Sequence, residues 1–271
     1  MTTRRTTLRT LAGLGTLGAL GLSATPVAAV PTQPAGGGTA ADPYVITTVQ
    51  ELQWMQNELR AFYVLGDDID ASETAGWNGG AGFSPIGTFD KFDPSTRFRG
   101  TFKGQGYTIS GLTIDRPAQN YVGLFGLPNN ASITNVTLAD LAVTGNDNVG
   151  GLVGVNAGTV SGSSASGRVT GSGINVGGLV GENSPFGTVS ESSASGRVTG
   201  DDNVGGLVGF NYGPVSESSA SGRVTGDDYV GGLVGRNNEL VCGSEARGSV
   251  SGNTNVGDLV GGGNPAQEFC T

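Results

Sequence analysis

The sequence predicts an all-β protein, a parallel β-helix (β-solenoid) with about 26–28 residues per rung and a short N-terminal capping helix. One observation is a repeat, because the segment VGGLVG begins at Val149, Val176, Val204 and Val230. A second is a longer repeat, because the nine residues SSASGRVTG occur unchanged at Ser163–Gly171, Ser192–Gly200 and Ser218–Gly226. The third is composition, since 50 of the 271 residues are Gly and only 7% are aromatic. This composition predicts a thin core built mostly from Val, Leu and Ile.

The repeat extends beyond the four identical copies. A variant, VGDLVG, begins at Val256, and a shorter relative, VGLFG, begins at Val122, so successive copies lie 26 to 28 residues apart. A propeller blade needs about 40 residues, which favours a solenoid. Each copy contains three β-prone pieces, namely VGGLVG, then TVS or PVS, then GRVTG, with Gly, Asn, Asp and Ser between them. We therefore predict three short strands per rung.

Stacking explains why such small and polar segments are repeated. In a β-helix each residue lies about 4.8 Å from its equivalent in the next rung, so a residue that stacks well is useful in every rung. We expect an inward column of Val169, Val198 and Val224 and an outward column of Thr170, Thr199 and Thr225. The Ser, Ala and Gly residues beside them allow tight turns.

Residues 42–121 are predicted to hold the capping helix and the first rungs. Thr48 and Glu51 form a capping-box pattern at the start of TVQELQWMQNELR, and Leu52, Met55 and Leu59 share one face of that helix. A helix over the end of a solenoid protects its open strand edges. Strands are then expected at Tyr63–Asp70 and within Phe98–Ile114.

Residues 1–29 read as an export signal. Three arginines (Arg4, Arg5 and Arg9) precede a Gly-diluted apolar run at residues 11–22, and small residues at 27–29 provide a cleavage site. The arrangement is similar to a twin-arginine signal, with ordinary secretion as the alternative. The apolar run is shorter than the ~20 residues that span a membrane, so no stable span is expected in the mature chain. Residues 30–41 are expected to be a flexible linker.

The repeated block resembles the GLUG motif. The resemblance rests on the Gly-Leu-x-Gly centre of VGGLVG together with NxGxVSxS and SGxVTG, and on the preceding segments YVLGDDIDAS, PIGTF and YVGLFG. It covers about residues 42–263 and implies a secreted or surface-exposed β-helix of the adhesin-like kind. The last copy departs from the pattern, with Asp258 in place of Gly and Arg247 expected one position out of its column.

Composition excludes several functions. The net charge of −9 argues against nucleic acid as a partner, because that affinity comes from basic patches. The absence of His removes HExxH zinc sites and Ser-His-Asp triads. Carboxylates alone can hydrolyse glycosides, and the densest acidic cluster comprises Asp67, Asp68 and Asp70. We expect these three residues to shape a turn.

Four further carboxylates recur after GRVTG. Asp201 and Asp202 occupy one turn, and Asp227 and Asp228 occupy the same turn one rung later. Such a cluster of oxygen ligands is compatible with calcium, although the alternative is a solvated acidic edge. No other cofactor is expected.

The two cysteines are predicted to form a disulfide. Counting from Asn237, Cys242 falls in the column of Ser161, Ser190 and Ser216, and Cys270 falls in the same column one rung later. The stacking distance suits a disulfide, and export places the pair where disulfides persist. The bond would close the C-terminal end of the repeat β-helix at residues 122–271. Two sequons, at Asn130 and Asn135, are glycosylation candidates.

These observations together predict an exported, non-enzymatic β-solenoid with a structural or adhesive role, secreted or at the cell surface. Surface glycans or proteins are the expected partners. The alternatives are a carboxylate-based carbohydrate-active enzyme and a carbohydrate- or calcium-binding module without catalysis. The few aromatic residues in the repeats argue against a long sugar-binding groove there.

Overall fold

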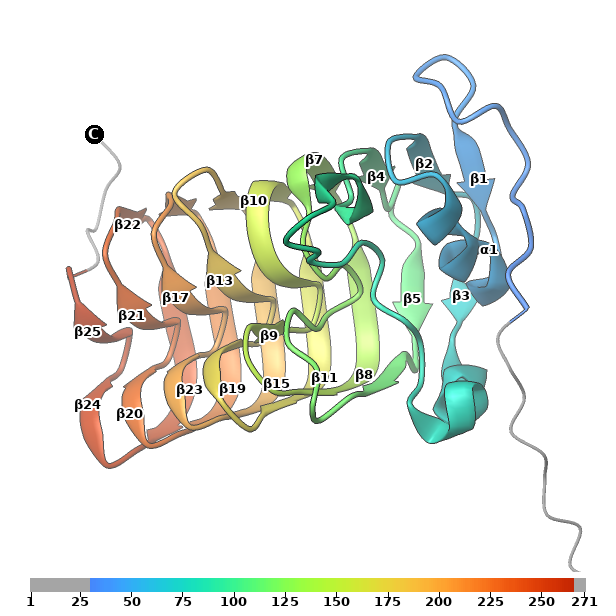
Figure 1. Ribbon diagram of the computed structural model, residues 1–271. Coiled ribbons are helices and arrows are strands. Elements are labelled where there is room, and N and C mark those ends of the chain that lie inside the picture. The colour runs from blue at the N-terminus through green and yellow to red at the C-terminus, as the bar shows by residue number, and fades with distance from the viewer. Residues whose placement is uncertain (1–29, 266–271) are drawn as a thin grey trace, which may run out of the picture.

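The computed structural model describes residues 30–265, which form a parallel β-solenoid of about six turns (Figure 1). All pairings between its named strands are parallel, as predicted. The strands form three sheets that run along the solenoid axis.

The first sheet contains, in spatial order, β1 (Tyr44–Ile46), β2 (Phe62–Leu65), β4 (Thr101–Lys103), β7 (Asn129–Thr134), β10 (Val153–Ser161), β13 (Val180–Asn183), β17 (Val208–Asn211), β21 (Val234–Asn237) and β25 (Val260–Gly263), with a branch from β10 through β14 (Thr188–Ser190) and β18 (Val215–Ser216) to β22 (Val241–Cys242). The second sheet contains β3 (Ile69–Asp70), β5 (Thr108–Ser110), β8 (Thr137–Gly145), β11 (Ser164–Gly171), β15 (Ser193–Thr199), β19 (Ser219–Thr225) and β23 (Glu245–Ser251), with β6 (Thr113–Asp115) beside β8. The third sheet contains β9 (Val149–Gly150), β12 (Ile174–Gly177), β16 (Asp202–Gly205), β20 (Asp228–Gly231) and β24 (Thr254–Gly257).

Each regular turn has four strands, so the prediction of three is wrong. The segment VGGLVG is not one strand: β16 ends at Gly205 and β17 begins at Val208, with a corner between them. Leu207 at this corner is fully buried, and a Cβ on Gly206 would lie 2.0 Å from the carbonyl oxygen of Gly232. Glycine is required there because the backbone of the next turn passes so close.

The register of the repeats agrees with the sequence alignment. Val176 pairs with Val149 on one side and with Val204 on the other, and the column continues through Val230 to Val256. The column of Val169, Val198 and Val224 is buried, and the neighbouring threonines are half-buried on the outer side. The inward and outward columns are therefore confirmed.

The N-terminal helix is present but shorter than predicted. α1 spans Val49–Trp54 and a 3-10 turn, η1, continues to Asn57. The capping box forms as expected, since the Thr48 hydroxyl accepts from the Glu51 amide and the Glu51 carboxylate accepts from the Thr48 amide. Two further 3-10 segments, η2 (Ser72–Gly80) and η3 (Pro94–Thr96), lie in the connections of this part. The strand predicted at residues 63–70 is divided into β2 and β3.

The segment after the predicted signal is held against the first turn. The amide of Val45 donates to the carbonyl of Ala35 at 2.8 Å, and the amide of Phe62 donates to the carbonyl of Gly38 at 2.9 Å. The predicted linker, residues 30–41, is therefore hydrogen-bonded to the first turn at Ala35 and Gly38. The predicted export signal at residues 1–29 lies outside the described residues. Within residues 30–265, no helix is long and apolar enough to cross a membrane.

Candidate functional site

One column of asparagine side chains lies inside the solenoid. Asn156, Asn183, Asn211 and Asn237 are fully buried, and the side-chain amide of each of the first three donates to the side-chain oxygen of the next Asn at 2.8–2.9 Å. The amide of Asn237 donates to the backbone carbonyl of Asn264 at 2.8 Å, at the end of this ladder. Paired in this way, the buried amides avoid the cost of an unsatisfied polar group. The ladder thus stabilises the stack and leaves these side chains unavailable to a ligand.

The first Ser of each SSASGRVTG copy is also structural. The amide of Ser163 donates to the hydroxyl of Ser192 at 3.2 Å, and the amide of Ser192 donates to the hydroxyl of Ser218 at 3.1 Å. Each hydroxyl donates in turn to a carbonyl two residues earlier in its own turn. The three serines are at most 2% exposed, so this corner is closed to a ligand.

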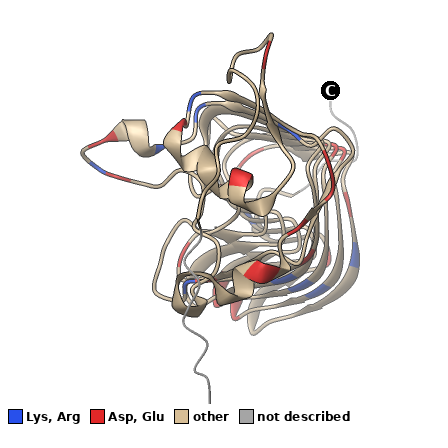
Figure 2. Ribbon diagram, turned by 90° about the vertical axis from the view of Figure 1, so that its right-hand side faces the viewer, with Lys and Arg blue, Asp and Glu red and all other residues tan. Residues whose placement is uncertain are grey.

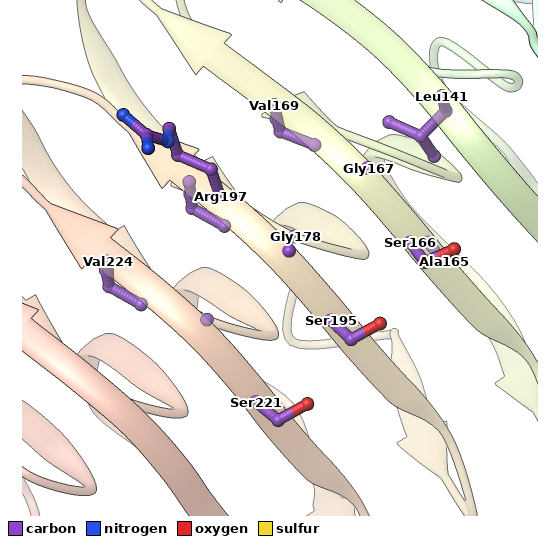
Figure 3. Close-up of a pocket in the computed structure, with 13 residues that line it drawn as sticks. Leu141, Ala165, Ser166, Gly167, Val169, Gly178, Ser195, Arg197, Ser221 and Val224 are labelled. Atoms are coloured by element: carbon purple, nitrogen blue, oxygen red, sulfur yellow. The ribbon is translucent and has the colours of Figure 1, made fainter.

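The outer face of the second sheet carries the exposed part of the same nine residues. Arg168 on β11, Arg197 on β15 and Arg223 on β19 are paired in register and exposed. Figure 3 shows Ser166, Ser195 and Ser221 in a line across successive strands, and Arg197 extending away from β15. We call these three arginines the Arg column. The sequence analysis did not identify this exposed column. The signal for it was the position of each Arg directly before a Val expected to point inward, since neighbouring strand residues face opposite sides.

The void beneath this face is small. It is lined by inward side chains such as Val169, Val198 and Val224 and has a volume of about 10 Å³ (Figure 3). This is space for about one water molecule at most. Any ligand of this face would therefore have to bind on its outer surface.

Of the four repeated aspartates, Asp202 and Asp228 begin β16 and β20 of the third sheet, and Asp201 and Asp227 lie in the turns just before these strands. Asp202 and Asp228 are paired in register and half-buried, whereas Asp201 and Asp227 are exposed. The described part of the chain contains no group of three or more His, Cys, Asp or Glu residues arranged to hold a metal ion. Calcium binding by these aspartates stays a prediction.

Neighbouring side chains already engage some of these carboxylates. Asp228 accepts from the Asn255 amide at 2.7 Å and from the Thr254 hydroxyl at 2.5 Å. These hydrogen bonds, that from Thr254 first, lower the pKa of Asp228 below its usual range. Asp227 accepts from the side chain of Asn253 at 3.0 Å. Both carboxylates thus tie the turn to the following rung.

The acidic cluster near the N-terminus also shapes a turn, in agreement with expectation. Asp68 accepts from the backbone amide of Thr108 at 2.7 Å, and Asp70 accepts from that of Ser72 at 2.9 Å. Hydrogen bonds from Ser72, that from its side chain first and that from its backbone amide second, lower the pKa of Asp70. Asp67 accepts from the amide of Asp68. All three residues are exposed rather than gathered in a cleft.

The cysteine column is confirmed for Cys242. Ser161 pairs with Ser190, Ser190 with Ser216, and Ser216 with Cys242, which is 1% exposed on β22. Cys270 lies outside the described residues, so the disulfide stays a prediction. Arg247 is corrected: it pairs with Ser221 and is displaced by two positions from the Arg column, not by one.

Both glycosylation candidates are accessible. Asn130 lies on β7 and Asn135 in the turn between β7 and β8, and both are exposed. Each has a positive φ, 52° for Asn130 and 54° for Asn135, a conformation that asparagine adopts more readily than most residues. Both sequons thus remain candidates.

A broader hollow lies at the N-terminal end of the solenoid. It has a volume of about 620 Å³, is open to solvent, and is lined mostly by polar residues in and beside η1 and η3, including Gln56, Asn57, Glu58 and Ser95. The adjoining loop carries Phe92, which is 89% exposed. Amides, hydroxyls and an exposed ring are groups that can contact sugars, but the hollow is shallow.

Comparisons with known proteins agree with this picture. Residues 172–199 match the family model described as "The GLUG motif". A halomucin of Haloquadratum walsbyi is 43% identical over 153 residues, which is 54% of this chain and 2% of that protein. A putative Gly-rich membrane protein of Evansella cellulosilytica is 38% identical over 131 residues, 46% of this chain and 14% of that protein. The chain thus matches only a small part of each relative, and its resemblance to GLUG-motif repeat proteins is confirmed.

Proposed function

We propose that this protein is an exported β-solenoid with a structural and adhesive role, secreted or held at the cell surface, and without catalytic activity. The observation that carries the proposal is the way each repeated turn uses its side chains. Buried Asn and Ser residues stack to rigidify the rod, while Arg, Ser and Thr recur on its outer face one rung apart. A rigid rod with a periodic surface suits display and multivalent contact.

The relatives support the location. One is named halomucin and the other a putative Gly-rich membrane protein, which fits a place outside the cytoplasm. The basic and apolar pattern of residues 1–29 provides the export route, with the twin-arginine pathway as the specific proposal.

The absence of catalysis is proposed from the carboxylates. Glycoside hydrolysis uses two carboxyl groups about 5–9.5 Å apart across a bound sugar. The acidic residues described above are not gathered in a cleft; most are exposed, and several accept hydrogen bonds from neighbouring turns and strands. The alternative of a carbohydrate-binding module draws its support from the polar hollow beside η1.

Localisation tests the proposal directly. The full chain is produced in a cell with both export pathways, and intact cells and medium are probed with protease and antibody. We expect the protein outside the cytoplasm, and retention of an R4K/R5K variant if the twin-arginine route is used. Cytoplasmic wild-type protein would contradict the proposal, whereas export of the double variant would contradict only the route.

Adhesion and catalysis need separate measurements on residues 30–271. Binding to whole cells and to a glycan array is expected, with heat-unfolded protein as the control. Reducing-end assays on the glycans that bind should detect no cleavage. Cleavage that is lost when Asp68 and Asp70 are changed to Asn would favour the enzyme.

A further inference from the structure

The Arg column is an unneutralised basic stripe on an acidic protein. The chain has a formal net charge of −9, yet Arg168, Arg197 and Arg223 lie in consecutive strands about one strand spacing apart, ~4.8 Å. Within residues 30–265, none of the three makes an ion pair, a hydrogen bond from its side chain or a contact with an aromatic ring. Like charges at this spacing repel one another unless ions or a ligand screen them.

Several other arginines of the chain have partners. Arg116 donates to the carbonyl of Phe83 at 3.1 Å, Arg236 lies over the rings of Phe210 and Tyr229, and Arg247 pairs with Glu245 at 3.0 Å. The guanidinium groups of the Arg column make no such contact and are exposed. Figure 2 shows basic segments on successive turns along one side of the solenoid.

Hydroxyl groups line both sides of the column. Ser166, Ser195 and Ser221 precede the arginines by two residues, and the Thr column (Thr170, Thr199 and Thr225) follows them by two residues. Ser195 and Ser221 are exposed. The result is a strip, three turns long, on which each turn offers one guanidinium fork flanked by hydroxyl donors. Arg247, opposite Ser221, lies outside the column, and its charge is paired with Glu245.

We propose that this strip binds one linear acidic polysaccharide lying along the solenoid axis. Its carboxylate or sulfate groups meet successive guanidinium forks, which suit planar or tetrahedral oxyanions bidentately, and its hydroxyls meet the serines and threonines. Individually weak contacts add up because one polymer engages several turns at once. The proposal rests on the proposed adhesive function and names the ligand class for it.

The observations favour a polysaccharide over two other polyanions. Nucleic acid would bring a dense row of phosphates toward a protein of net charge −9 that offers only a single short basic column. The acidic edge of a second copy is a poor match, because its four aspartates occupy only two turns. Ile174 precedes and Thr254 follows Asp202 and Asp228 in their column, so carboxylates on two turns would face arginines on three.

The test uses the purified chain of residues 30–271 with four probes: polygalacturonate for carboxylates, dextran sulfate for sulfates, neutral dextran, and duplex DNA. Binding is measured by biolayer interferometry at several salt concentrations. The variants are R168Q/R197Q/R223Q, its all-Lys counterpart, and R247Q as a matched control outside the column. Circular dichroism melts check that each variant folds, which is expected because the substituted side chains are exposed.

We expect binding to at least one acidic polysaccharide, none to dextran, and weakening by added salt. The triple Gln variant should bind roughly tenfold or more weakly, the Lys variant should be intermediate because it loses the forked geometry, and R247Q should stay within about twofold. The polysaccharide that binds identifies the anionic group.

Three results would overturn the proposal. They are an unchanged affinity of the triple Gln variant, equal binding of DNA with the same dependence on the column, or self-association at low salt that the triple variant loses. If the protein is exported and adheres to cells but gives one of these results, the proposed function stands. Only the proposed ligand class is then contradicted. Cytoplasmic protein would remove the function itself.

Discussion

The two halves of the solenoid build the same column of the core from different side chains. One inward column of the first sheet runs from Tyr44 through Tyr63, Phe102 and Ile133 to Val160, and continues as valine at positions 189, 215 and 241. All of these side chains are at most 5% exposed. The core thus changes from aromatic to aliphatic along the axis while the backbone register is kept.

The two halves fill their interiors with side chains of different size. In the N-terminal turns, rings such as Phe98 and Phe125 contact each other, at 4.8 Å between centroids. In the repeats, the corner glycines face Ala side chains closely, and a Cβ on Gly178 would lie 2.9 Å from that of Ala194. Stability in the N-terminal half therefore depends on individual large residues, and in the repeats on many equivalent small ones.

The largest expected effect is on the free energy of unfolding, and it differs between the two halves within that one column. Phe102→Ala should destabilise the protein by about 3–5 kcal/mol, because a fully buried ring is removed and a cavity remains. Val189→Ala, in the same column, should cost about 2 kcal/mol, since it removes two methyl groups. Urea unfolding measures both, and equal costs would mean that the two halves do not differ in this way.

Two glycines, one in each half, test how closely neighbouring backbones approach. Gly206→Ala should cost about 1–3 kcal/mol, because the new methyl group would overlap the Gly232 carbonyl in the next turn. Gly76→Ala, in η2 of the N-terminal half, has no atom within 4 Å of the added carbon and should change stability by less than about 0.5 kcal/mol. Thermal melting of both variants gives the answer, and a tolerated Gly206→Ala would show that the repeat corners can relax.

One interruption of the repeat offers a way to stabilise the protein by substitution. The buried side-chain amides of Asn175 and Asn203 donate to Asn148 and Asn175, but the Asn203 oxygen has no donor because the next turn places Tyr229 there. Tyr229→Asn should supply the missing donor at a position with a φ of 53°, which asparagine tolerates well.

The Tyr229→Asn variant also loses the contact of the ring with Arg236, so we expect a net stabilisation of about 1 kcal/mol or less. The matching Tyr229→Ala variant loses the ring without supplying the donor and should be less stable than wild type. A melting temperature of Tyr229→Asn equal to that of Tyr229→Ala would contradict the explanation.

The smallest expected effect concerns pH. Glu182 occupies a column held by Val155 and Phe210 in the adjacent turns, and burial raises the pKa of its half-buried carboxyl, with a hydrogen bond from Asn175 acting in the opposite direction. A raised folded-state pKa means that its stabilising contribution is complete below the unfolded-state pKa and is lost as pH rises through the folded value. Glu182→Gln should therefore be slightly more stable than wild type at pH 7. The advantage should vanish near pH 4, as unfolding curves at both pH values would show, and a constant difference would contradict the assignment.

The sequence predicted most of the repeated half and less of the N-terminal half. Stacking equivalent residues requires only the period, so the Val columns and the place of Cys242 beneath Ser216 could be read from the alignment alone. The Arg column could also have been predicted, because each Arg directly precedes a Val that was expected to point inward. The aromatic core was not predicted, since Phe98, Phe102 and Phe125 come from segments without a period and meet only through packing.

The sequence by itself determined the fold class, the length of the turn and the partners within each ladder, because a repeated segment brings identical residues one strand spacing apart. Only the tertiary structure decided where the chain bends. It placed a corner inside VGGLVG, where two backbones approach too closely for a side chain, and so made four strands per turn instead of three. The tertiary structure also decided that Asp227 and Asp228 accept hydrogen bonds from the following rung, whereas the Arg column faces solvent. Hydrogen bonds across turns depend on side-chain direction and not on spacing alone.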